Sequence, residues 1–198
     1  QWNVDIWGAE GVEADAELIS VLAHFFESVG LSEEDLVIRV SSRKVLEEVL
    51  GKLGISGDDF SKTCVIMDKM DKLPPEAIQT QLAEIGLDQG AVSTIQEVLA
   101  IDGLEQLSEE LGEDSIAAHE LRSLFSLVES YGLEEWISFD ASVVRGLAYY
   151  TGPVFEANDR SGDLRAICGG GRYDRLIGTL GGKDLPATGF GFGDMVIL

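Results

Sequence analysis

The composition and charge of this 198-residue chain set the first limits on its function. With 45% hydrophobic and 25% charged residues, it is long enough to bury the core of one large or two small globular domains. Thirty-six acidic residues outnumber fourteen basic ones, and the formal charge of −22 repels polyphosphate over most of the surface. This argues against a stand-alone nucleic-acid binder, but it permits an enzyme whose nucleic-acid contacts are made by another domain.

The N-terminal part of the chain predicts the order strand, helix, strand, helix. Residues 1–6 alternate polar and apolar side chains, which is the period of a strand with one polar and one apolar face. Residues 13–29 change to three-and-four spacing, which indicates an amphipathic helix with an apolar face of Ala14, Leu18, Leu22, Phe25 and Val29. The run 35–40 is typical of a buried strand, and Ser41 or Ser42 can cap the helix that follows.

The middle of the chain changes character, and we expect a mostly helical insertion over residues 58–130 between two parts of one core, 1–57 and 131–198. Short helical segments follow one another here without a convincing strand. Pro74 and Pro75 suit a helix start, because a proline at the first helical position gives up no intrahelical hydrogen bond. The predicted core residues of this insertion are Ile78, Leu82, Ile85, Val92, Ile95, Val98 and Leu99.

Strands resume in the C-terminal part, at residues 135–140, 149–157, 164–169 and 188–198. A tight turn such as 158–163 is too short for a crossover helix, so we expect these strands to be antiparallel. The fold class is therefore α+β, with an antiparallel sheet flanked by helices and interrupted by the helical insertion.

The sequence predicts neither a membrane segment nor a metal site. No apolar run reaches the roughly 18 residues of a membrane span, and the opening residues lack the features of a signal peptide. Cys64 and Cys168 lie far apart, with no further cysteine or histidine at metal-ligand spacing. We expect an intracellular protein of the cytoplasm or of an organellar stroma or matrix, not a secreted or membrane-bound one.

The stretch RGLAYYTGPVFE, residues 145–156, places a cation and two phenols beside a strand. The planar guanidinium of Arg145 stays charged and can hold a carboxylate and a phosphate oxygen together, although a surface ion pair is the alternative. Tyr149 and Tyr150 would face opposite sides of the predicted strand. They fit either a ligand site or a core-and-rim position.

Two glycine-rich stretches follow. In CGGGRYD (168–174), Gly170 and Gly171 would let backbone amides approach a ligand closely, or they form a strained turn. In GFGFGD (189–194), every second side chain is absent, which leaves a strand face open to a flat ligand or allows tight packing beneath a helix. Neither stretch matches the dinucleotide fingerprint or a P-loop.

Taken in order, QWNVDIWG, VVRGLAYYTGPVFE, CGGGRYD and ATGFGFGD resemble the catalytic domain of the class II histidyl-tRNA synthetases. These stretches match the second strand of motif 2, two histidine motifs and the glycine-rich strand of motif 3. The resemblance is strong over roughly residues 1–20 and 136–198. It is weak across the helical middle, where that family has a variable insertion. It implies a class II synthetase sheet and a catalytic-domain fragment that begins within motif 2 and lacks the anticodon-binding domain.

The resemblance also implies the reaction and the residues that serve it. Histidine's carboxylate would attack the α-phosphate of ATP to give histidyl-adenylate, and the histidyl group would then pass to tRNA(His). Arg145 would stabilise the charge that grows on the phosphate. The resemblance places the following residues at histidine: Gln1, Asp5, Tyr149, Tyr150 and Tyr173. It places the following residues near ATP or the adenylate: Gly170, Gly171, Gly191 and Gly193.

In the complete enzyme the resemblance implies Mg²⁺ with ATP, a homodimer, and tRNA contacts made mainly through parts outside this chain. The fragment alone is expected to be inactive. Two alternatives stay open. The chain could be a histidine-binding relative like the regulatory subunit of ATP phosphoribosyltransferase, or an interaction fragment without catalysis.

Overall fold

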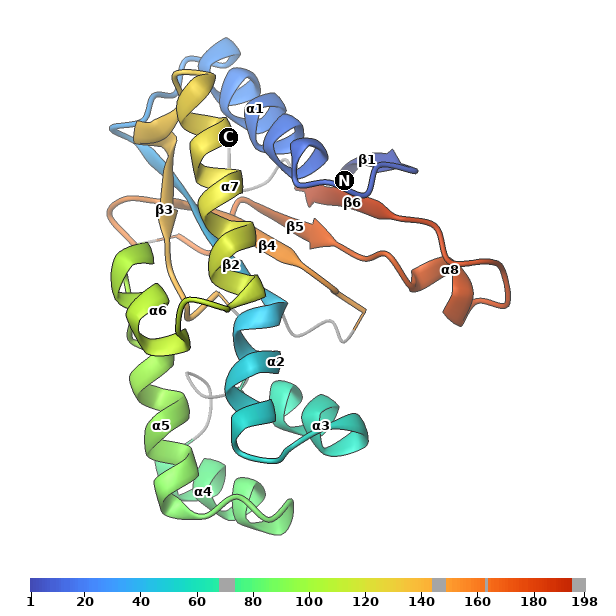
Figure 1. Ribbon diagram of the computed structural model, residues 1–198. Helices are drawn as coiled ribbons and strands as arrows, with labels where there is room; N and C mark the ends of the chain where they lie inside the picture. The colour runs from blue at the N-terminus through green and yellow to red at the C-terminus, as the bar shows by residue number, and fades with distance from the viewer. Residues whose placement is uncertain (68–73, 144–148, 163, 194–198) are drawn as a thin grey trace.

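The computed structural model describes residues 1–67, 74–143, 149–162 and 164–193, which form a six-stranded sheet with helices packed against it (Figure 1). The strands are β1 (Trp2–Trp7), β2 (Leu36–Ser42), β3 (Ile137–Phe139), β4 (Pro153–Asp159), β5 (Cys168–Arg172) and β6 (Ala187–Phe192). The helices are α1 (Glu13–Ser28), α2 (Arg43–Lys52), α3 (Gly57–Met67), α4 (Pro75–Glu84), α5 (Gln89–Leu99), α6 (Leu104–Leu111), α7 (Ile116–Ser130) and α8 (Leu176–Thr179), with a 3-10 turn η1 at Glu134–Trp136.

The sheet has the order β1-β6-β5-β4-β2-β3 and is mixed. The strand pairs β1–β6, β6–β5, β5–β4 and β4–β2 are antiparallel, as the sequence predicts. The pair β2–β3 is parallel, so the expectation of an antiparallel strand at 135–140 is wrong. The reason is the connection between these two strands. It runs through the helices α2 to α7, and a long helical crossover allows parallel pairing where a tight turn does not.

The strands β4 and β5 each begin four residues later than the sequence predicts. The strand expected over 149–157 starts only at Pro153, which has no N–H to donate, and the preceding Gly152 carbonyl accepts a 2.9 Å bond from the backbone N–H of Arg43. Tyr149 and Tyr150 therefore precede the strand, and the expectation that they face opposite sides of it is wrong. Likewise β5 starts at Cys168, because the Asp159 side chain accepts a 3.0 Å bond from the Leu164 N–H and holds that residue in the turn.

The helices α1 and α7 lie side by side over one face of the sheet and form the main core with it (Figure 1). Phe26 of α1 is fully buried and stacks on Trp136, with ring centroids 6.2 Å apart. The predicted apolar face of α1 is displaced at its end, since Val29 is exposed and Phe26 takes the buried position. The predicted cap of α2 is present, because the Ser42 hydroxyl accepts a bond from the Lys44 N–H.

The helical middle of the chain has the elements that the sequence predicts, with α4 starting at Pro75 after Pro74. Ile85 and Leu99 of the predicted core are half-buried, and the other five residues are buried. The last of these helices, α7, packs against α1, α2 and β2, and so belongs to the layer that supports the sheet. Among the described helices, none combines the length and apolar character that crossing a bilayer requires.

Candidate functional site

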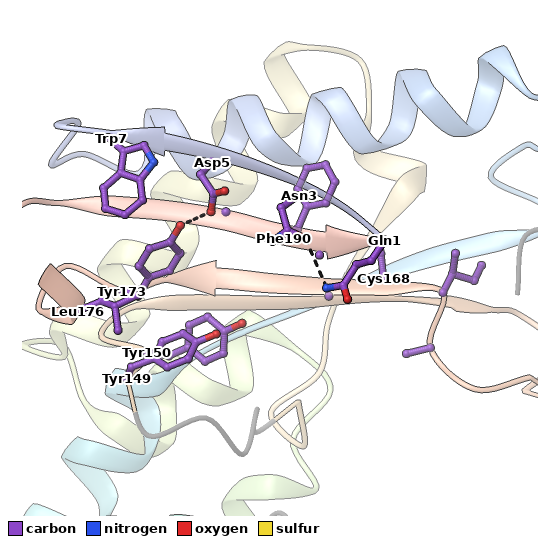
Figure 2. Close-up of a pocket in the computed structure, with 15 residues that line it drawn as sticks. Gln1, Asn3, Asp5, Trp7, Tyr149, Tyr150, Cys168, Tyr173, Leu176 and Phe190 are labelled. Carbon is purple, nitrogen blue, oxygen red and sulfur yellow. Dashed lines mark hydrogen bonds between the residues drawn. The ribbon is translucent and has the colours of Figure 1, made fainter. Parts of the chain in front are cut away.

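A cavity of about 560 Å³ opens over the β1, β6 and β5 end of the sheet (Figure 2). Residues that lie far apart in the sequence meet in it, because the sheet places the first strand beside the last two. It is lined by Gln1, Asn3, Asp5, Trp7, Tyr149, Tyr150, Ala166, Ile167, Cys168, Gly169, Tyr173, Leu176, Gly189, Phe190 and Gly191.

The odd-numbered side chains of the first strand form one wall of the cavity. Successive side chains of a strand point to opposite faces, so Gln1, Asn3, Asp5 and Trp7 share the cavity side (Figure 2). The polar face that the alternation predicts is therefore the face turned to the cavity. Sequence reasoning missed Asn3 and Trp7, although the same period of two placed them beside Gln1 and Asp5.

Glycines form the floor of the cavity. In the sheet register Asp5 pairs with Gly189, and Asn3 pairs with Gly191, which in turn pairs with Gly169. A Cβ atom on Gly189 would collide with the Asp5 carboxylate and would lie 2.8 Å from the Val4 carbonyl oxygen. The absence of a side chain at Gly189 is therefore what allows the carboxylate to lie over β6.

The Tyr173 hydroxyl donates a hydrogen bond to the Asp5 carboxylate (Figure 2). Burial and the neighbouring Asp5 carboxylate raise the pKa of Tyr173 well above its usual range, so the phenol keeps its proton at neutral pH. The ring of Tyr149 lies 4.7 Å from that of Tyr150 and 5.8 Å from that of Tyr173, between centroids. The three predicted tyrosines thus form one aromatic wall, and Trp7 meets Tyr173 edge-on at 5.8 Å.

The cavity is suited to a ligand that donates hydrogen bonds or carries positive charge. None of the described residues that line it is a lysine or an arginine, and Asp5 supplies a carboxylate. Amides of Gln1 and Asn3 add donors and acceptors, as a group with two ring nitrogens and an ammonium requires. Arg145, the predicted catalytic residue, lies outside the described residues.

The four glycines predicted near ATP have different surroundings. Gly191 lines the cavity, whereas Gly170 and Gly171 are not among its lining residues. A Cβ atom on Gly170 would lie 2.7 Å from the Cα of Phe190, and one on Gly171 would lie 2.6 Å from the Pro153 carbonyl oxygen. These two glycines therefore serve close packing between strands, while Gly193 has open space on its Cβ side.

A buried ion pair ties the cavity to the segment between β1 and α1. The Nε and Nη2 atoms of Arg172 donate to the Asp15 carboxylate at 3.0 and 2.7 Å. Nη1 donates to the Ala9 carbonyl at 2.9 Å and to Asp174 at 3.2 Å, and Nη2 donates to the Gly11 carbonyl at 2.7 Å. Because Arg172 directly precedes the tyrosine that binds Asp5, this network positions both ends of the Tyr173–Asp5 pair.

Burial and pairing act in opposite directions on the ionisation of Asp15 and of Arg172. It raises the pKa of Asp15 to about 6, against the opposing effect of the Arg172 charge. Burial alone would lower the pKa of Arg172, but the Asp15 and Asp174 carboxylates outweigh it and raise that pKa. Both members are therefore charged above pH 6.

The described residues offer no ready ligand set for a metal. No group of three or more His, Cys, Asp or Glu side chains converges within them. Cys64 and Cys168 are both free and buried, and burial raises the pKa of the Cys64 thiol to about 11. The Mg²⁺ that accompanies ATP in the expected reaction thus finds no such cluster of ligands in the described part of the chain.

Comparisons with known proteins identify the family of the chain. The family model "Histidyl-tRNA synthetase" matches residues 1–193. The chloroplastic/mitochondrial histidine–tRNA ligase of Arabidopsis thaliana is 52% identical over the whole chain, which covers 41% of that protein. The histidyl-tRNA synthetase structure from Nostoc sp. PCC 7120 aligns with a TM-score of 0.82 and 28% identity, over 98% of this chain and 48% of that one.

A Bacillus halodurans structure titled "ATP phosphoribosyltransferase regulatory subunit/histidyl-tRNA synthetase" shares the fold, with a TM-score of 0.78 and 23% identity over 96% of this chain and 50% of that one. The chain spans half or less of the length of these three relatives. The family match covers nearly every residue, including the strands that line the cavity. The chain belongs to the histidyl-tRNA synthetase family.

Proposed function

We propose that this chain forms the histidine pocket of a histidine–tRNA ligase, which activates histidine with ATP and transfers it to tRNA(His). The observation that carries the proposal is the Asp5–Tyr173 hydrogen bond on the wall of a cavity lined by amides and phenols. A neutral imidazole needs an acceptor for its N–H and a donor for its other nitrogen. A carboxylate held by a protonated phenol, together with the amides of Gln1 and Asn3, supplies both.

The first chemical step needs no general base, because histidine's carboxylate is already an anion. The difficulty is to bring two anions together and to stabilise charge on the phosphate. The described lining of the cavity holds no cation for this, so we assign the task to Arg145 on the strength of the family motif. Gly191 and Gly193 are the glycines that we propose near ATP or the adenylate. No step is assigned to Mg²⁺.

The remaining properties follow from the family alone. We propose that tRNA(His) is bound mainly by parts of the enzyme outside this chain, since a charge of −22 repels RNA. We also propose a homodimer, and a location in the cytoplasm or in an organellar stroma or matrix. The name of the Arabidopsis relative, chloroplastic/mitochondrial, supports the organellar option.

Changing Tyr150 or Tyr173 to phenylalanine is expected to weaken histidine binding about tenfold, because one hydrogen bond to a polar or charged partner is lost. The melting temperature should stay nearly unchanged, since the ring and its packing remain. Isothermal titration with histidine measures the first effect and thermal unfolding the second. Tyr131→Phe, at an exposed tyrosine beyond the end of α7, is the matched control and should bind histidine normally. A loss of stability without a loss of affinity would assign the two tyrosines to the core instead.

Gly189→Ala is expected to reduce histidine affinity at least tenfold, because the new Cβ must displace the Asp5 carboxylate from its place over β6. The same crowding should lower the free energy of unfolding by about 1–3 kcal/mol. Gly193→Ala is the control, since its Cβ enters open space. Titration with histidine and urea unfolding of both variants test this. Full affinity in Gly189→Ala would show that Asp5 does not contact the ligand.

A further inference from the structure

A second cavity, of about 270 Å³, lies against the same pair of tyrosines as the histidine pocket. Tyr149 and Tyr150 line both cavities, so the two spaces are neighbours across the aromatic wall. We call it the arginine cavity. It is lined by Arg43, Glu47, Phe60, Ser61, Tyr149, Tyr150, Thr151, Arg175 and Thr179, which come from α2, α3, the segment before β4, and α8 with the residue before it.

The most unusual group in the arginine cavity is the side chain of Arg43. Only 4% of this residue is exposed, and its guanidinium carbon lies 4.8 Å from the centroid of the Phe60 ring. Its Nη1 atom has no hydrogen-bond partner in the described part of the protein. Buried guanidinium donors are almost always paired, because an unmet donor on a charged group is costly. Nη1 is itself shielded from solvent, so an anion in the cavity would act on Arg43 by balancing the charge of its guanidinium.

A second guanidinium lines the same cavity. Arg175 is exposed on the wall formed by the segment that leads into α8. Within the described ranges, neither Arg43 nor Arg175 lies within ion-pair distance of a carboxylate, although Glu47 contributes to the lining. By contrast, a carboxylate lies within ion-pair distance of Arg39, Lys44, Lys62 and Arg172.

The convergence of two arginines stands out in a chain with 36 acidic and 14 basic residues. Over most of this surface an anion meets repulsion, and here two arginines and Ser61 line one cavity together with the single carboxylate of Glu47. Guanidinium groups present planar pairs of N–H donors that match the oxygens of a phosphate. The volume of the cavity accommodates a phosphate group with part of the unit that carries it.

We propose that the arginine cavity binds a phosphate group of the second substrate that reaches the aromatic wall. The phosphate is either part of the polyphosphate of ATP or a phosphodiester near the 3′ end of the acceptor RNA. The choice of ATP or acceptor RNA as the source of the phosphate rests on the proposed function. The phosphate site itself is inferred from Arg43 and Arg175, which lie behind Tyr149 and Tyr150. It adds an anion subsite on the side of the tyrosines away from the imidazole-binding pair Asp5 and Tyr173.

Titration of the full 198-residue chain tests this with two probes, ATP and a short single-stranded RNA with a free 3′ hydroxyl. The side-chain Nε–Hε NMR signals of Arg43 and Arg175 report binding even when it is weak. We expect both signals to shift with at least one probe. Arg175→Gln should lower the affinity of the protein for that probe about tenfold, which is the effect of losing one charge-assisted hydrogen bond. Arg122→Gln, which removes an exposed arginine on α7 away from the cavity, should leave the affinity unchanged.

The outcomes separate the source of the phosphate from the existence of the site. If Arg175→Gln loses affinity for the RNA alone, the phosphate belongs to the acceptor end. If it loses affinity for ATP alone, the phosphate belongs to the polyphosphate of ATP. A loss of affinity for both probes shows a shared subsite. Unchanged affinity of Arg175→Gln for both probes, or an equal loss in Arg122→Gln, overturns the proposal. Arg43→Gln is a further test if circular dichroism shows that it folds, and Arg175→Gln decides the matter if it does not.

A separate titration with histidine distinguishes this inference from the proposed function. Arg175→Gln should bind histidine as the unchanged protein does, because Arg175 is not among the residues that line the histidine pocket. Failure of the unchanged chain to bind histidine would contradict the proposed function and leave the phosphate result to stand by itself. If the chain binds histidine but neither ATP nor the RNA shifts the Arg43 and Arg175 signals, only the proposal of a phosphate site in the arginine cavity is contradicted.

Discussion

Replacing Asp15 by alanine is expected to lower the free energy of unfolding by about 3–5 kcal/mol, the usual effect of removing one partner of a buried ion pair. Asp15 is fully buried and accepts two hydrogen bonds from Arg172, whose guanidinium would remain buried with fewer partners. Urea unfolding followed by circular dichroism measures the change. The experiment belongs at pH 8, above the pKa of about 6 that burial gives Asp15, where the pair is ionised.

Two further variants show how much of this loss of stability comes from leaving a buried charge without its partner. Asp15→Leu combined with Arg172→Met removes both charges, and should be more stable than Asp15→Ala because no unpaired cation remains. Asp59→Ala removes one partner of the exposed pair with Lys62, and should cost less than about 1 kcal/mol. If Asp15→Ala were no worse than Asp59→Ala, the buried pair would not hold the β1–α1 segment in place.

Arg145→Lys in the complete enzyme is expected to slow histidyl-adenylate formation about 10²- to 10³-fold, the effect of losing one preorganised donor to developing charge. Histidine affinity should change little, because the described lining of the proposed histidine pocket includes no lysine or arginine. A lysine keeps the charge but loses the planar pair of donors. Pyrophosphate exchange measures the rate, and titration measures histidine binding.

The control for Arg145→Lys is Arg122→Lys, at an exposed position that should exchange pyrophosphate at the normal rate. A normal rate in Arg145→Lys would remove the assignment. Histidine binding by the unchanged complete protein without any pyrophosphate exchange would favour a histidine-binding relative that does not catalyse activation. The first result concerns the Arg145→Lys variant and the second concerns the unchanged protein, so each can be interpreted independently.

Local patterns predicted much of the fold, because local forces decide those elements. The strand predicted from the alternation in residues 1–6, the Ser42 cap and the proline start of α4 depend on neighbours along the chain, and the structure has all three. The parallel β2–β3 pair was not predictable from the length of a single turn, since the partner strand lies beyond the whole helical segment.

Some residues of the candidate site could also be predicted from the sequence, and others could not. Gln1, Asp5 and the three tyrosines were identified by motif, and the structure brings them together in one cavity. The Asp15–Arg172 pair escaped notice, because an aspartate in the first turn of a helix is expected to face solvent and complement the helix dipole. Likewise nothing in the sequence relates Arg43 to Arg175, since only the tertiary fold places α2 and the start of α8 around one cavity.

The pairing of β2 with β4 has a consequence for how the chain folds. This pair joins Leu36 to Asp159 across the entire helical segment, and both of its strands are interior strands of the sheet. The ends of so long a loop meet at a large entropic penalty, and contacts between residues distant in sequence are associated with slow folding. Compaction of the helices α3 to α7 shortens the distance that the chain must close. The histidine pocket needs β1, β6 and β5, and these strands join the sheet through the pairing of β5 with β4. We therefore expect the pocket to be completed late in folding.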